Sequence, residues 1–429
     1  MREKNCRMRK LVSFAAFLLL SFALKAQNVD NIVFDNRVYV NDLATVQCYL
    51  EDYPYSLPVI SLNSGEQLVL SFDDFNNDSR YLKYTFIHCT HDWKQDGLSQ
   101  LEYLDGFMED EISDYSYSFN TIEHYTHYSL SFPNDIMRII KSGNYILYVY
   151  DDTQDNPVLT RRFMVMEPSP AKVFGEVQKA SDVVNMFTHQ EVDFIVNTGN
   201  YIVRNPSMYL HANIVQNGRW DNAVTGLRYR SGKPGEYSFN YDNNENAFTG
   251  GSDFRVFDTK SLRYNGTNIV SIGYQNHTNY AFVVQDEARP YGAYVSNPTL
   301  HGYYYIKNED FSGVNTEDYV KTVFTLRTEF PVTGGKLYVF GALTDWQIKP
   351  EAELKQNQYN GLWEAVLLLK QGFYNYQYVY VKDGSEEIDA TYIEGSHWET
   401  PNEYSVLVYL QDEGQVYDKL IGYSTFKIQ

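Results

Sequence analysis

The sequence predicts an all-β protein: three consecutive β-sandwich domains, immunoglobulin-like or early-set-like, behind a cleaved signal peptide. Three observations lead to this class. Apolar and polar residues alternate along short runs such as residues 67–72 and 145–150, which is the period of a strand. Turn-forming clusters such as Asn63-Ser64-Gly65 separate the runs. The chain has 39 tyrosines and 25 phenylalanines, which favour strands, and no stretch predicts a long helix.

Residues 1–26 have the pattern of a signal peptide. Basic residues between Arg2 and Lys10 precede an apolar run over residues 11–24, which is short for a membrane span, and Ala26 supplies a small residue at the cleavage point. We therefore expect the remainder of the chain to be exported. Because it contains no other apolar run long enough to cross a membrane, we also expect it to be soluble after export.

The exported part is strongly acidic. Residues 1–26 carry six of the 35 basic residues and one of the 55 acidic ones, so the remainder has a formal net charge of −25. Such a charge repels nucleic acid and anionic lipid headgroups, and it favours neutral or cationic partners. Two cysteines remain after cleavage, Cys48 and Cys89. They could pair as a disulfide in an oxidising compartment, and two buried free thiols are the alternative.

Residues 27–168 are expected to form the N-terminal sandwich domain. Its predicted strands include residues 45–50, 67–72 and 145–150. The domain ends at Glu167-Pro168-Ser169-Pro170, because two prolines so close together cannot lie in a central strand.

Residues 169–290 repeat the pattern and are expected to form the middle domain, with strands such as residues 207–215 and a tight turn at Asn217-Gly218. Arg255 lies between acidic residues on an apolar strand. We expect it to form an internal salt bridge and not to bind a ligand.

Residues 291–429 are expected to form the C-terminal domain. A strand at residues 336–340 leads to the turn Gly341–Trp346, and strands at residues 361–370 and 372–381 follow. This order resembles the early-set sandwich of glycogen-binding modules. Trp346 and Trp363 could present flat faces for stacking on sugars. The alternative is that Trp363, on an apolar strand, fills the sandwich core.

Two patterns resemble metal sites. His88, His91, His124 and His127 form two H-x-x-H pairs, but on a strand residues three apart point to opposite faces. Asp74, Asn76 and Asp78 resemble the first half of an EF-hand loop, but Ser79 and Thr85 stand where its glycine and glutamate belong. We predict no metal site and no cofactor.

Catalytic patterns are also missing from the sequence. There is no G-x-S-x-G nucleophile motif and no glycine-rich phosphate loop. Paired carboxylates lie in predicted turns, where acidic residues are common anyway. We predict that the protein is not an enzyme, although glycosidase carboxylates cannot be recognised in one sequence.

The whole exported chain resembles the plug protein family of the type IX secretion system, a family of Bacteroidetes. The resemblance lies in the order and number of short motifs, with departures at Asp253 and Pro401. The motifs are His88-Cys89 with Asp92-Trp93, E-Y-L-D-G-F at 102–107, S-F-N-T at 118–121, Y-T-H-Y at 125–128, F-P-N at 132–134, S-G-N-Y at 142–145, R-R-F-M-V at 161–165, Q-N-G-R-W-D at 216–221, D-F-R-V-F-D at 253–258, L-K-Q-G at 369–372, I-E-G-S at 393–396 and T-P-N-E-Y at 400–404.

The resemblance implies a periplasmic, non-enzymatic protein, peripheral to the outer membrane and monomeric outside its complex. Such a plug binds the periplasmic side of a very large outer-membrane β-barrel translocon and closes its pore while no substrate is exported. The alternative function is a periplasmic carbohydrate-binding protein that uses the C-terminal sandwich through Trp346 and Trp363.

One long aromatic insertion, residues 93–119, is the predicted partner-binding segment. Ordered loops of this length are usually functional. We expect it either to brace the N-terminal domain or to form part of the docking surface, with Trp93, Tyr103, Leu104 and Phe107 as the partner-binding residues.

Overall fold

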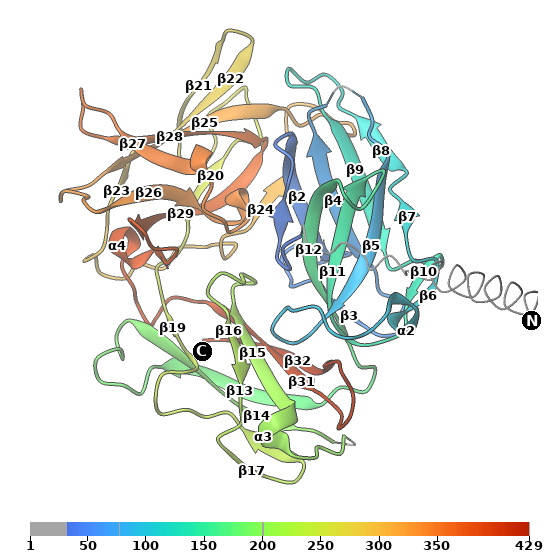
Figure 1. Ribbon diagram of the computed structural model, residues 1–429. Helices are drawn as coiled ribbons and strands as arrows, with labels where there is room; N and C mark the ends of the chain where they lie inside the picture. Colours follow the sequence, from blue (N-terminus) through green and yellow to red (C-terminus); the bar gives the residue numbers. More distant parts are fainter. Residues whose placement is uncertain (1–31, 77, 200, 429) are drawn as a thin grey trace, which may run out of the picture.

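The structure is a computed structural model that describes residues 32–76, 78–199 and 201–428. The predicted signal peptide, residues 1–26, lies outside the described residues. Figure 1 shows a chain built almost wholly of strands, with single-turn helices at α2 (Gln100–Tyr103), α3 (Pro206–Tyr209) and α4 (Thr391–Glu394). The all-β prediction is confirmed. Among the described residues, no helix has the length and apolar character that a membrane span requires.

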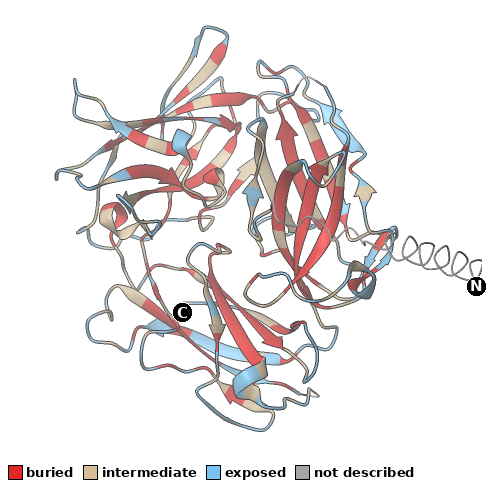
Figure 2. Ribbon diagram, viewed as in Figure 1, coloured by how far each residue is buried: buried red, intermediate tan, exposed pale blue. Residues whose placement is uncertain are grey.

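The N-terminal unit, residues 32–167, is a sandwich of two sheets. The alternating strands place large side chains such as Phe72, Phe86 and Tyr145 between the sheets, where they are fully buried. Figure 2 shows long stretches of the strands of this unit in red, the colour of buried residues. A two-stranded ribbon of β6 (Leu104–Gly106) and β10 (Met137–Ile139) closes one end, next to α2. The first sheet has the order β2 (Leu43–Leu50), β4 (Leu68–Asp74), β9 (Thr126–Phe132) and β8 (Asp114–Tyr117).

The second sheet of this sandwich continues into the middle unit and has ten strands in all. The two halves meet where β12 and β32 pair in parallel at Met166 and Leu420. The order is β16 (Val224–Leu227), β15 (Leu210–Gln216), β31 (Glu403–Leu410), β32 (Lys419–Lys427), β12 (Pro157–Met166), β11 (Gly143–Asp151), β5 (Leu82–Cys89) and β7 (Asp110–Glu111), while β1 (Arg37–Val38) and β3 (Val59–Ser61) also pair with β12.

The middle unit consists of residues 171–250 together with residues 403–428. A second sheet packs on the β16–β32 half of the large sheet. The core between them joins residues far apart in sequence, such as Phe194, Ile214 and Val406. This second sheet has the order β13 (Lys172–Lys179), β14 (His189–Asn197), β18 (Glu236–Ser238) and β17 (Ser231–Lys233), and β19 (Ala247–Thr249) also pairs with β14.

The C-terminal unit, residues 251–402, is an eleven-stranded sheet that curves around its own core. Phe257, Phe324 and Tyr376 meet in that core. Two 3-10 turns, η1 (Ala342–Thr344) and η2 (Pro350–Ala352), lie beside it. The order is β20 (Arg255–Asp258), β29 (Gly372–Lys382), β26 (Gly335–Phe340), β27 (Glu353–Gln356), β28 (Trp363–Lys370), β25 (Tyr319–Arg327), β22 (Thr278–Val283) and β21 (Ile269–Gln275), with β23 (Asp286–Glu287), β24 (Tyr304–Ile306) and β30 (Ile388–Asp389) at its sides.

The strand pairing corrects the expected division of the chain into residues 169–290 and 291–429. Strand β20 pairs with β29, β22 pairs with β25, and β21 pairs with β22, so all three belong to the sheet of the C-terminal unit and not to the middle domain. The last hairpin, β31–β32, returns to pair with β15 and completes the middle unit. Strand β31 is buried on both faces: Val406 lies in the core of the middle unit, and Leu407 lies in the apolar cluster shared with the N-terminal unit.

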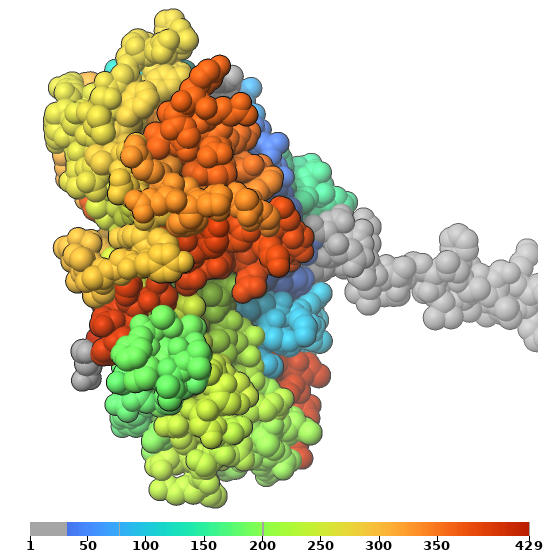
Figure 3. Space-filling model, turned by 90° about the vertical axis from the view of Figure 1, so that its left-hand side faces the viewer, coloured from blue at the N-terminus to red at the C-terminus, as the bar shows by residue number. Residues whose placement is uncertain are grey.

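The three units pack around a common junction. Figure 1 shows the N-terminal unit beside the C-terminal unit, with the middle unit below both. In Figure 3 the C-terminal unit stands on the middle unit, and late residues coloured orange-red and red lie between them. Side chains hold this seam: the amide Nε2 of Gln190 donates to the carbonyl oxygen of Thr400 at 2.6 Å, and Asn402 Nδ2 donates to Gln190 Oε1 at 3.0 Å.

Candidate functional site

A buried charge cluster locks the N-terminal unit to the C-terminal unit. Lys370 Nζ donates to Asp73 Oδ2 at 2.6 Å, and the hydroxyl of Tyr319 donates to the same oxygen at 2.7 Å. On the other side, His127 Nδ1 lies 2.6 Å from Asp73 Oδ1. Burial raises the pKa of the Asp73 carboxyl, but the hydrogen bond from His127 and the charge of Lys370 outweigh burial, and that pKa lies below its usual value.

A second set of bonds extends the same seam. The backbone N–H groups of Ile122 and Glu123 donate to the two carboxylate oxygens of Asp318 at 3.0 and 3.1 Å. The hydroxyl of Tyr125 donates to the carbonyl oxygen of Glu317 at 2.9 Å. These hydrogen bonds connect the loop before β9 with the residues just before β25. The N-terminal and C-terminal units are therefore in contact at several places and not only at the Asp73–Lys370 pair.

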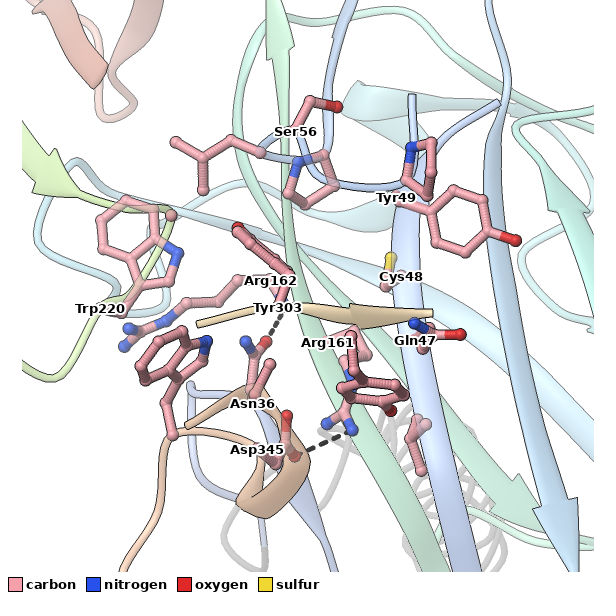
Figure 4. Close-up of a pocket in the computed structure, with 18 residues that line it drawn as sticks. Asn36, Gln47, Cys48, Tyr49, Ser56, Arg161, Arg162, Trp220, Tyr303 and Asp345 are labelled. Carbon is pink, nitrogen blue, oxygen red and sulfur yellow. Dashed lines mark hydrogen bonds and ion pairs between the residues drawn. The ribbon is translucent and has the colours of Figure 1, made fainter. Parts of the chain in front are cut away.

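The three units together line a small cavity (Figure 4). Arg161 of β12 and Asp345 of the C-terminal unit form an ion pair across it at 2.9 Å, and Trp220 of the middle unit lies at its edge. The cavity has a volume of about 80 Å³. Ligand pockets usually measure ~300–1,000 Å³, so this cavity has room for a few waters and not for a sugar. We interpret it as the centre of the junction between the units.

Aromatic packing joins the N-terminal and middle units. The rings of Trp93 and Trp220 meet edge to face at 5.0 Å, and the guanidinium of Arg162 lies 4.6 Å from the centre of the Trp93 ring. Beneath them, Ile146 and Leu407 belong to one apolar cluster that draws on both units. With the other seams, this contact makes the protein one body and not three domains on flexible linkers.

The partner-binding prediction is wrong for three of its four residues. Trp93, Tyr103 and Leu104 are buried: Trp93 at the seam just described, Leu104 in the N-terminal core, and Tyr103 with its hydroxyl donating to the carbonyl oxygen of Phe86 at 3.1 Å. A buried side chain cannot contact a partner without unfolding its surroundings. These three residues therefore take the bracing role, and only Phe107 is exposed.

Phe107 belongs to an exposed apolar cluster that the sequence analysis missed. We call it the ribbon patch: Phe107, Ile136 and Ile140 on the β6–β10 ribbon, which are 68%, 46% and 46% exposed. The N–H of Phe107 donates to the carbonyl oxygen of Ile136 at 2.9 Å, so the two residues are neighbours. The alternation Ile136-Arg138-Ile140 was the available signal, because residues two apart on a strand share a face.

Of the two alternatives for Cys48 and Cys89, the structure has the free thiols and not the disulfide. Cys48 lies on β2 and packs against the N-terminal core, whereas Cys89 belongs to the cluster between the N-terminal and middle units. The two clusters lie on opposite faces of the β5–β11–β12 half of the large sheet. Burial raises the pKa of the Cys48 thiol to about 12 and that of Cys89 well above its ordinary value, which disfavours the reactive thiolate form of both.

The two predicted sugar-stacking tryptophans lie in different places. Trp363 packs against the C-terminal core, and its buried indole N–H has no partner among the described residues. Trp346 lines the junction cavity, where the guanidinium of Arg219 lies 4.9 Å from its ring centre and Phe340 meets it edge to face. Trp363 is partly buried against the core, and the two rings do not form one platform.

The four histidines of the H-x-x-H pairs are not gathered at one place. His88 Nδ1 lies 2.5 Å from Asp96, His91 Nδ1 lies 2.9 Å from Asp418, His127 contacts Asp73, and His124 is exposed. Within residues 32–76, 78–199 and 201–428, no group of three or more histidine, cysteine or acidic side chains is placed to hold a metal ion. Asp74 of the EF-hand-like stretch pairs with Arg80 at 2.6 Å.

His91 has a further neighbour in His211, whose ring stacks on it at 4.0 Å. Burial, together with the nearby charges of His91 and Arg228, lowers the pKa of His211 to about 4. His211 is therefore neutral at physiological pH, and its Nε2 donates to the carbonyl oxygen of Met208 at 3.0 Å.

The internal salt bridge predicted for Arg255 is confirmed. Arg255 lies 2.7 Å from Asp286 and 3.0 Å from Glu394, and Arg289 lies 2.7 Å from the same Glu394. Glu394 also accepts the N–H of Tyr378 at 2.9 Å. Burial raises the pKa of the Glu394 carboxyl, but the two guanidinium groups outweigh burial and hold that pKa below its usual value.

The N-terminal unit matches a known family. The model described as "Type 9 secretion system plug protein 1st domain" matches residues 43–167. A crystal structure of a hypothetical protein from Parabacteroides merdae has a TM-score of 0.87 and 32% sequence identity, and the match covers 92% of this chain and 100% of that one. No curated protein matches the sequence.

Two other solved structures were found at much lower similarity. The C-terminal domain of the Streptococcus pyogenes antigen I/II-family protein AspA has 7% identity and a TM-score of 0.14, with 90% of this chain and 99% of that chain covered. Dimeric latent PorU from Porphyromonas gingivalis has 10% identity and a TM-score of 0.14, with 90% and 34% covered. At these scores neither bears on the fold or the function.

Proposed function

Because the chain belongs to the type 9 secretion system plug protein family, we propose that it binds the periplasmic mouth of that system's large outer-membrane β-barrel translocon and closes the pore while no substrate is exported. In this role the protein is periplasmic, peripheral to the outer membrane and not an enzyme.

The observation that carries the proposal is that the three units form one body. A plug must fill a wide aqueous opening and withstand contact with the barrel without rearranging. Three flexibly linked domains would leave gaps. The Asp73–Lys370 and Arg161–Asp345 pairs hold the N-terminal unit against the C-terminal unit, and the Trp93–Trp220 contact holds it against the middle unit.

The ribbon patch is the part of the predicted docking segment that can meet a partner. Along the ribbon, Phe107 and Ile136 lie on one side of the exposed ion pair of Asp105 and Arg138, and Ile140 lies on the other side. Apolar anchors beside polar groups suit a reversible interface. Closure must be released for export, so the contact should be modest and in competition with substrate or another component. The acidic surface of the protein complements a basic rim on the barrel.

The proposal is tested by purifying the tagged protein with its partners from solubilised envelopes of the host. Wild-type protein is expected to recover the β-barrel translocon. The variant Phe107→Ser/Ile136→Ser is expected to recover about tenfold less, because losing two central apolar anchors typically costs more than 1 kcal/mol of binding free energy.

The matched control is Tyr359→Ser, which removes an exposed ring from the C-terminal unit, far from the ribbon patch. It should recover as much barrel as wild type. Both variants should keep the wild-type melting temperature, since exposed side chains contribute little to stability. Equal recovery by all three proteins would reject the ribbon patch as the docking surface, and no barrel with wild type would reject the plug function.

A further inference from the structure

Strand β21 is a free edge of the C-terminal sheet. The sheet order ends at β21, which pairs on one side with β22, and no other described strand pairs with its outer side. Figures 1 and 3 show the yellow β21–β22 hairpin projecting at the top of the molecule, away from the middle unit. The strand has seven residues, which is long for an unprotected edge.

The edge lacks the devices that usually protect such strands. Its sequence, I-V-S-I-G-Y-Q, contains no charged residue and no proline. Three other edges are blunted by charge: β8 carries Asp114, β17 carries Lys233, and β7 consists of two acidic residues. The edge strand β16 is uncharged but has only four residues. The edge of β2 is uncharged too, but the C-terminal unit covers it at the contact of Thr45 with Tyr319.

The hairpin geometry shows which backbone groups are unpaired. Asn276 and His277 both have positive φ, 51° and 58°, and form a two-residue turn, so Gln275 and Thr278 flank it as a hydrogen-bonded pair. Bonded and non-bonded pairs then alternate along the hairpin. The N–H and C=O groups of Ile272 and Tyr274 therefore point away from β22, towards solvent.

The edge strand itself carries exposed side chains. Val270 and Tyr274 of β21 are 58% and 63% exposed, and a methyl group built on Gly273 would meet no atom within 4 Å. On the adjacent strand β22, Phe282 is paired in register with Ser271 and is 41% exposed. A strand added beside β21 would complete the backbone bonds of the edge and contact the side chains of β21.

We propose that the β21 edge binds an extended, neutral or basic segment of another polypeptide as an added β-strand. The unpaired backbone groups define the occupant, because only another extended chain satisfies alternating N–H and C=O groups. A second copy of this protein is disfavoured, since the exported part of each copy has a formal net charge of −25. This site is separate from the ribbon patch, which lies on the N-terminal unit, and gives the protein a second binding surface.

The test uses a fluorescent eight-residue peptide of alternating valine and threonine with a lysine at each end. Binding to the full exported chain is followed by fluorescence anisotropy, and hydrogen exchange reads the amides of Ile272 and Tyr274. We expect binding, with slower exchange at these two amides. Tyr274→Pro, which removes one outward N–H and leaves the pairing with β22 intact, should bind the peptide about fivefold more weakly or worse.

Tyr274→Phe is the matched control, because it keeps the N–H and the ring, and it should bind as wild type does. The same peptide with prolines at its central positions should not bind. The Phe107→Ser/Ile136→Ser variant, which alters only the ribbon patch, should bind the peptide as wild type does. A loss of peptide binding at β21 can therefore be distinguished from a loss of barrel binding at the ribbon patch. Unchanged exchange at Ile272 and Tyr274, or a dimer in sedimentation that Tyr274→Pro abolishes, would overturn the proposal.

Discussion

Replacing Lys370 with methionine is expected to lower the free energy of unfolding by about 3–5 kcal/mol, because it leaves the fully buried Asp73 without its cation. The bond between Tyr319 and Asp73 cannot replace the lost charge. Since Asp73 and Lys370 belong to different units, the effect should be largest on the opening of the N-terminal unit from the C-terminal unit. Urea unfolding, followed by circular dichroism, measures the loss.

The control is Lys321→Met on the neighbouring strand β25. Lys321 is paired in register with Leu368 and makes no ion pair within the described residues, so its loss should cost less than about 0.5 kcal/mol. Adding Asp73→Asn to Lys370→Met should restore much of the stability, because the double variant buries no charge. If Lys370→Met unfolds at the same urea concentration as Lys321→Met, the cluster does not lock the units together.

Replacing Glu394 with glutamine is the second large expected effect, again about 3–5 kcal/mol. Glu394 is buried between Arg255 and Arg289, and its removal leaves two guanidinium groups with too little negative charge beside them. Glu353→Gln is the control: its pair with Lys336 at 2.9 Å is on the surface and should contribute at most about 1 kcal/mol. Thermal unfolding of the two variants compares them, and similar losses would contradict the argument.

Glu394 also predicts a pH dependence. The pKa of the Glu394 carboxyl is lower in the folded than in the unfolded protein. Its ionised form therefore stabilises the fold fully at pH values above the pKa of the unfolded state, and this stabilisation is lost as the pH falls through the pKa of the folded state. The unfolded value lies near 4, so wild type should lose stability below about pH 4. Glu394→Gln should lose less than wild type over that window.

Local structure was predictable because the two-residue alternation of a strand depends only on residues that are close in the sequence. Residues 145–150 alternate and form β11, and Asn217-Gly218 forms its turn with both φ angles positive. Arg255 was predicted correctly for the same reason, since an arginine among acids on an apolar strand needs a buried partner. These inferences depend on short stretches and on general chemistry.

What the sequence could not show is which distant strands meet. Nothing in residues 403–427 indicates that they complete the middle unit, because β-pairing is non-local and any alternating strand would fit. Asp73 and Lys370 are separated by 297 positions in the sequence and form the buried ion pair between the N-terminal and C-terminal units. Trp93, Tyr103 and Leu104 were misassigned because an aromatic loop has the same composition whether it packs inwards or faces a partner.

The central claim is that this protein closes a pore, and outer-membrane leakage in intact cells tests it most directly. Uptake of a large hydrophilic dye is measured in wild-type cells, in cells that lack this protein, and in cells that lack both this protein and the barrel. If the protein closes the pore as proposed, high uptake is expected only in cells that have the barrel and lack this protein. Equal uptake in all three strains would contradict it.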